Sequence, residues 1–190
     1  MKLQPLFTVK ANELYTIDEN NGNPLNLEFA DISDLQIKPD MSSGSFYRII
    51  IDQKVIEPEP ECYDESFLAA LRDFLKQLEE NRQFAVLHII PGKTEQEKKQ
   101  ISTSGAEDES VQLYVACVKH TARRVKDCVS VAGVEFVSEF IDENAESKIS
   151  FLIDELKVKH AQYVYFIKEN DKDKISLLED EYKDVIVLEK

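Results

Sequence analysis

From residue 46 onward the chain repeats one unit, a short apolar strand followed by an amphipathic helix, and this repeat restricts the fold more than any other feature. Residues 46–51, 84–90 and 131–136 are apolar runs rich in β-branched side chains. Residues 67–78 and 111–127 carry apolar side chains at helical spacing. Runs that are apolar on both faces are typical of parallel strands. Strands that alternate with helices are joined by right-handed crossovers, so the sequence predicts an α/β fold with a parallel sheet.

The repeat continues towards the end of the sequence. Residues 147–160 have the periodicity of a further helix, and residues 163–167 are the strand that follows it. Residues 175–183 and 185–188 fit a last short helix and strand.

The amino-terminal part is predicted to be β structure. Residues 7–10 and 14–17 alternate apolar and polar side chains around Ala11-Asn-Glu13, which indicates a hairpin. Residues 25–30 fit a strand that follows a turn. We therefore expect a single α/β domain over residues 1–190, with the hairpin and first strand in residues 7–30 and the repeated units in residues 46–190.

Two connecting segments are predicted to lie in solvent. Residues 57–61, Glu-Pro-Glu-Pro-Glu, contain prolines that exclude a helix and charges that favour water. Residues 93–110 are polar and predict a long exposed loop, with a helical turn near residues 95–100. Loops of this length in compact domains are usually functional or disordered.

The charge balance argues against two classes of partner. The chain has 37 acidic and 23 basic residues and a net charge of −14, which repels phosphate backbones and anionic lipid. We expect no nucleic-acid partner and no membrane partner. No apolar leader follows the first lysine and no run approaches the ~18 apolar residues of a membrane span, so we expect a cytoplasmic location.

A local basic stretch stands against this acidic background. It contains Lys119, His120, Arg123, Arg124 and Lys126 in the second half of a predicted helix. Cations there complement the negative end of the helix dipole. We favour this structural role over anion binding.

The sequence predicts no cofactor and no metal. It has no Walker A or dinucleotide-binding glycine pattern, and its 5 glycines leave little material for a phosphate-binding loop. Cys62, Cys117 and Cys128 have unrelated spacings without a CxxC pair, so neither a disulfide framework nor a zinc site is indicated. Cys117 is expected to be a small core residue.

The strongest candidates for chemistry are Glu135 and Glu139, which the strand at residues 131–136 delivers at or just beyond its end. In an α/β barrel the carboxyl ends of the strands are where catalytic residues are placed, and a rigidly held carboxylate there is suited to acid/base work. The alternative is that each is a solvated loop residue.

Several segments together resemble the amino-terminal half of a cellulase-like glycoside hydrolase of family 5, a (β/α)₈ barrel enzyme. Residues 7–27, with Asp18-Glu-Asn-Asn-Gly-Asn-Pro24, are similar to the family's opening hairpin and turn. Residues 46–51 resemble its second strand, which often carries an arginine at the place of Arg48, and residues 71–88 resemble its next helix and third strand. Residues 122–140 are similar to the helix and fourth strand that end in Asn-Glu-Pro.

By this resemblance Glu139 takes the place of the acid/base, while Ser138 and Phe140 replace the asparagine and proline. Arg48 and His88 are then expected to bind substrate, and the ligand would be a carbohydrate. A retaining glycosidase also needs a second carboxylate ~5 Å away, for which Glu189 is a weak substitute. The chain contains 0 tryptophans, although sugar-binding clefts commonly use large aromatic platforms.

These departures lead us to expect a truncated, degenerate glycoside-hydrolase-like domain that acts as a binding or scaffold protein. One alternative is an active β-glycoside hydrolase that uses Glu139 as acid/base, with Glu135 or Glu189 as its second carboxylate. The other is a small-ligand-binding protein with an open α/β sheet.

The expected architecture is a partial barrel, with an open doubly wound sheet as the alternative. A partial barrel exposes a strand edge and an apolar face, so we expect a homodimer, a partner chain or a segment of this chain to cover them. An inward-pointing Arg48 is expected to pair with a carboxylate, because an unpaired buried charge is costly.

Overall fold

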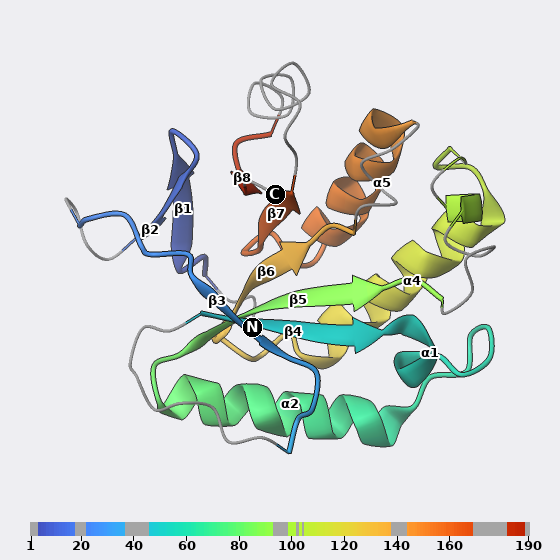
Figure 1. The fold of residues 1–190 in the computed structure, drawn as a ribbon, viewed down its shortest axis with the longest axis horizontal. Coiled ribbons are helices and arrows are strands. Elements are labelled where there is room, and N and C mark those ends of the chain that lie inside the picture. The colour runs from blue at the N-terminus through green and yellow to red at the C-terminus, as the bar shows by residue number, and fades with distance from the viewer. Residues whose placement is uncertain are drawn as a thin grey trace.

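The centre of the molecule is a six-stranded parallel sheet in which the strands follow one another in chain order, β3-β4-β5-β6-β7-β8, with a separate antiparallel hairpin, β1-β2 (Figure 1). This computed structural model describes residues 4–17, 22–36, 46–92, 99–101, 103, 105–137, 144–168 and 182–188. The strands are β1 (Phe7–Lys10), β2 (Glu13–Thr16), β3 (Phe29–Ile32), β4 (Phe46–Asp52), β5 (Phe84–Ile90), β6 (Val131–Glu135), β7 (Val164–Lys168) and β8 (Val185–Leu188). The helices are α1 (Gln53–Ile56), α2 (Glu65–Glu80), α4 (Glu109–Arg124) and α5 (Ala145–Lys157).

The two faces of the sheet are covered by different kinds of element. On one face, Ile49, Leu87 and Tyr165 belong to the large core that includes the apolar sides of α2, α4 and α5. On the other, Phe46 and Phe166 pack with residues of the hairpin. Figure 1 shows the sheet curling, with the helices outside it and the hairpin across the inner, concave side.

This arrangement confirms the predicted partial barrel. A doubly wound sheet needs helices on both faces and a reversal of strand order. The described helices that pack on the sheet cover one face only, and the strand order does not reverse. The doubly wound alternative is therefore wrong.

Helix α2 begins and ends where its sequence indicates. The Asp64 side chain accepts hydrogen bonds from the backbone N–H groups of Ser66 and Phe67, both at 2.9 Å, and so caps the first turn. Asn81 ends the helix. The buried face of α2 then packs against the convex side of the sheet through Leu68, Leu71, Phe74, Leu75 and Leu78.

The hairpin covers both the concave face and one edge of the sheet. Phe7 meets the ring of Phe84 edge-on, with 5.0 Å between the ring centroids. At the turn, Ala11 and Asn12 have φ values of 49° and 60°, a combination typical of tight hairpin turns. The Asn12 side chain donates to the carbonyl oxygen of Val187 at 2.9 Å and accepts from its N–H at 2.7 Å. The hairpin therefore covers strand β8 at the sheet edge. Coverage by a segment of this chain was one of the arrangements expected from the sequence.

A β-bulge in β6 decides where Glu135 points. Ala85 of β5 pairs with Val131, but the next residue, Val86, pairs with Gly133, which leaves Ala132 as the extra residue. Because side chains alternate along a strand, this insertion moves Glu135 to the concave face. A Cβ atom at Gly133 would lie 1.7 Å from the carbonyl oxygen of Val164, so only glycine allows the two strands to approach this closely.

Two predictions of solvent exposure are wrong in part. In the acidic segment 57–61, the Glu57 side chain is buried and accepts hydrogen bonds from the N–H of Glu61 at 2.7 Å and from Gln53 at 3.1 Å. In the segment 93–110, Ile101 is buried in the main core, and its carbonyl oxygen accepts a hydrogen bond from the buried Lys148 at 2.9 Å. Ile101, the one large apolar residue in this polar stretch, was the signal for the second contact.

Cys117 is a buried core residue, as predicted. Cys117 and Cys128 are buried as free thiols, and Cys62 is an exposed one. Burial is the main cause that raises the pKa of the Cys117 thiol, and the nearby Glu57 carboxylate adds to it. The helix predicted at residues 175–183 lies almost entirely outside the described residues.

We expect Gly133→Ala to lower the free energy of unfolding by about 3 kcal/mol or more, since the new Cβ must displace the backbone of β7. Gly105→Ala is the matched control, because its Cβ would meet the movable side chain of the exposed Glu107. Urea denaturation followed by circular dichroism measures both. Equal stabilities of the two variants would contradict the close approach.

Candidate functional site at the carboxyl ends of the strands

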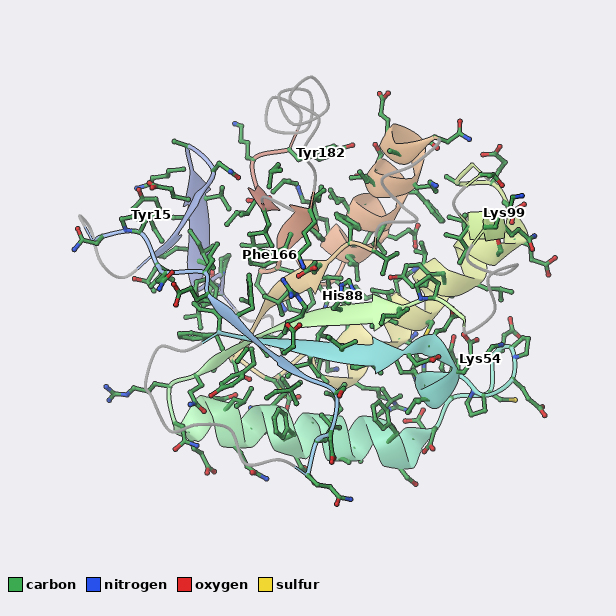
Figure 2. The ribbon with its side chains drawn as sticks, viewed as in Figure 1. Tyr15, Lys54, His88, Lys99, Phe166 and Tyr182 are labelled. Carbon is green, nitrogen blue, oxygen red and sulfur yellow. The ribbon has the colours of Figure 1, made fainter. Side chains whose placement is uncertain are left out.

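Five strands place a charged or titratable side chain on the concave face of the sheet. His88, Glu135 and Lys168 lie towards the carboxyl ends of their strands, whereas Arg48 is the third residue of β4. On β4, β5 and β7 each of these groups comes two residues after an apolar residue of the smaller core: Arg48 after Phe46, His88 after Val86, and Lys168 after Phe166. Period-two alternation puts both members of each pair on the same face. Asp31 of β3 and Glu135 of β6 complete the group, which we call the concave-face cluster. Figure 2 shows His88 and Phe166 on the inner side of the sheet.

Glu135 lies at the centre of this cluster. Its carboxylate accepts a hydrogen bond from Nε of Arg48 at 2.6 Å. Its other oxygen is 3.5 Å from Nδ1 of His88 and 3.5 Å from Nζ of Lys168. The side chain is only 1% exposed. A carboxylate this buried is held by its neighbours and has little access to water or to a ligand.

Arg48 connects the centre of the cluster to its rim. In addition to Glu135, it donates from Nη1 to Asp31 at 2.9 Å, and Asp31 is 54% exposed. Its guanidinium carbon lies 4.9 Å from the ring centroid of Phe29, within the range of a cation–π contact. The expected pairing of Arg48 with a carboxylate is therefore present, with Glu135 and Asp31 as the partners.

His88 is the titratable group next to Glu135. Burial is the main cause that lowers the pKa of its imidazole, and Arg48 and Lys168 lower it further, while Glu135 acts in the opposite direction. Nδ1 has no hydrogen-bond partner among the described residues, since its contact with Glu135 is an approach at 3.5 Å. Folding therefore disfavours the protonated imidazole relative to the unfolded chain.

The structure brings together Arg48, His88 and Glu135, three of the four residues that the sequence indicated. The fourth, Glu139, and the weaker candidate Glu189 lie outside the described residues. Asp31 and Lys168 were missed. Lys168 directly follows the apolar run 163–167, and alternation from Phe166 would have placed it on the same face as the site.

Within the described part of the chain, no group of three or more His, Cys, Asp and Glu side chains is placed to hold a metal ion. Over the same residues, no helix combines the length and apolar composition needed to span a bilayer.

The fold is similar to that of solved glycoside hydrolases of family 5. One is endo-glycoceramidase II from Rhodococcus sp., in complex with a cellobiose-like imidazole, with a TM-score of 0.53 and 13% identity over 65% of this chain and 40% of that chain. Another is the endoglucanase Cel5A from Pseudomonas stutzeri, with a TM-score of 0.50 and 14% identity over 65% of this chain and 38% of that chain. The resemblance seen in the sequence is thus confirmed at the level of fold.

This chain spans about 40% of the length of the solved structures that it matches. No protein-family model and no curated protein matches it. At 13–14% identity the similarity establishes a shared architecture, and the activity has to be argued from the site.

We expect Arg48→Met to destabilise the protein by about 3–5 kcal/mol, because it removes the closest partner of a buried carboxylate. The double variant Arg48→Met/Glu135→Met is expected to regain much of this loss, since no buried carboxylate is left at that position. Urea unfolding of the wild type, both single variants and the double variant gives the coupling energy.

Arg72→Met is the matched control for this cycle. Arg72 pairs with Asp127 at 2.5 Å, but both side chains are close to half exposed, so removing this pair is expected to change the stability little. A loss for Arg48→Met as small as that for Arg72→Met would show that Glu135 does not depend on Arg48.

The lowered pKa of His88 predicts acid sensitivity. An unfolded histidine has a pKa near 6.5, so on acidification the unfolded chain takes up a proton at this position before the folded chain does. The contribution of the neutral His88 side chain to the stability of the folded protein is therefore present above pH ~6.5, and it is lost as the pH falls below this value. We expect the free energy of unfolding to fall less steeply between pH 7 and pH 5 in His88→Gln than in the wild type. An unchanged slope in the variant would contradict the lowered pKa.

Proposed function

We propose that this chain is a noncatalytic carbohydrate-binding domain built on the glycoside hydrolase fold, with its ligand site at the concave-face cluster. The observation that supports the proposal is the state of Glu135, the one of the two main candidate carboxylates that lies within the described residues. A catalytic carboxylate must reach the glycosidic oxygen, the anomeric carbon or a water molecule. Glu135 is 1% exposed and is surrounded by Arg48, His88 and Lys168, so its role here is structural.

The outer part of the same cluster supports ligand binding. Lys168 is 37% exposed, and the His88 and Arg48 side chains are partly exposed around the sealed carboxylate. Ile50 and Ile90, which alternation places on the same face, are half-buried beside them. Hydrogen-bonding groups next to apolar surface suit a neutral polyhydroxylated ligand. The endo-glycoceramidase neighbour was solved with a cellobiose-like ligand, which makes β-linked glucose oligomers the first candidates.

Two assays test this proposal. We expect no turnover of 4-nitrophenyl β-cellobioside or soluble β-glucan above the buffer rate, in the wild type or in Glu139→Gln. In isothermal titration calorimetry we expect cellotetraose to bind the wild type, and His88→Ala to bind it roughly 10-fold more weakly, a change of ~1.4 kcal/mol. Arg72→Ala, on the outer helical surface, serves as the control and is expected to bind like the wild type.

Two outcomes would overturn the proposal. Turnover by the wild type that disappears in Glu139→Gln would establish the active hydrolase. Failure of cellotetraose and other β-glucan oligosaccharides to bind would exclude carbohydrate recognition and leave a scaffold role.

A further inference from the structure

A basic groove crosses the outer surface of the helices, away from the concave-face cluster. Its first part is a recess of about 500 Å³ beside α2 and the end of α4, where Arg72, Arg123, Arg124 and Lys126 line it together with Glu65 and Asp127. Its second part is a recess of about 300 Å³ beside α4 and the end of α5, lined by Lys119, Arg123, Glu155, Val158, Lys159 and His160. Arg123 lines both recesses, so the two adjoin at this residue, and together we call them the groove.

Half of the cations in the groove are neutralised by carboxylates of the chain itself. Arg72 pairs with Asp127, Arg124 with Glu65, and Lys119 with Glu155. Arg123, Lys126 and Lys159 are exposed, and none of them has a carboxylate partner among the described residues. Three uncompensated positive charges therefore lie along this groove in a chain whose net charge is −14.

In the second recess, His160 lies beside the three uncompensated cations. It lines the second recess, is 5% exposed, and stacks on Tyr163 with ring centroids 5.5 Å apart. Its Nδ1 atom has no hydrogen-bond partner within the described residues. Burial is the main cause that lowers the pKa of this imidazole, and Lys159, Arg123 and Lys126 lower it further. The same three cations thus act together at one point of the groove.

We propose that this groove binds an acidic peptide segment of a partner protein, with carboxylate side chains held by Arg123, Lys126 and Lys159. Val158, which is 66% exposed at the rim, and the exposed Ala69 in the first recess offer apolar contacts between the charged positions. An extended segment that alternates carboxylates with small apolar residues fits this lining.

The charge of the remaining surface selects a short peptide over larger polyanions. A nucleic acid or an anionic membrane extends beyond the groove and meets an acidic surface, which repels it. A short segment needs only the groove. This proposal is independent of the carbohydrate site, which lies on the concave face of the sheet.

The test uses a fluorescein-labelled hexaglutamate peptide and fluorescence anisotropy at 20 and 200 mM NaCl. We expect binding at low salt that weakens at high salt, and at least a 10-fold loss of affinity in Arg123→Gln/Lys126→Gln. The control variant Lys10→Gln/Lys183→Gln removes the same charge outside the groove and is expected to change the affinity less than 2-fold. A labelled hexaglutamine peptide is expected not to bind.

The proposal is wrong if hexaglutamate does not bind, if the two double variants lose affinity equally, or if hexaglutamine binds as well. Sedimentation velocity of the wild type and of both variants tests the alternative that a second copy of this chain occupies the groove. Self-association that only Arg123→Gln/Lys126→Gln abolishes would show that a second copy of this chain fills the groove, and would overturn the partner peptide.

Discussion

The concave face of a curved parallel sheet has to be filled, and in this chain the filling is aromatic and comes from the amino-terminal hairpin. Phe7 packs against Phe84 and Phe46, whose ring centroids lie 5.0 and 6.0 Å from its own. Leu14 of the hairpin is fully buried in the same layer. In a closed barrel the opposite strands would supply this layer. Here the hairpin supplies it, so the sheet keeps its barrel-like curvature with six strands.

The same face changes character towards the carboxyl ends of the strands, where polar groups replace the phenylalanines. Glu135 can be buried there because Arg48, His88 and Lys168 surround it. These cationic and polar neighbours compensate the buried carboxylate, which is shielded from solvent. The sealed state of this central carboxylate is the feature of the cluster that supports the proposed role in binding without cleavage.

The sequence predicted the elements well, because their signals are local. The apolar runs fixed the central strands, and Asp64 and Asn81 marked the ends of α2. The position of Glu135 on the concave face was not predictable in this way, because it depends on the bulge at Ala132. That bulge is a pairing irregularity between β5 and β6, and the order of apolar and polar residues along a strand does not reveal it. The burial of Glu57 was also not predictable, because it depends on a turn in which the N–H of Glu61 donates a hydrogen bond to the Glu57 carboxylate.

The hydrogen bonds between Asn12 and Val187 join residues 175 positions apart in the sequence. Contacts of such long range slow folding, because the entropy of closing the loop must be overcome before the contact forms. The hairpin precedes in the chain the edge strand that it covers, so the two can meet only after both have been made. Until then Phe46 and Phe166 lack their complete cover, and the nascent chain exposes an aromatic surface that is prone to aggregation. The interval before the hairpin docks is therefore when this aromatic surface is most open to aggregation.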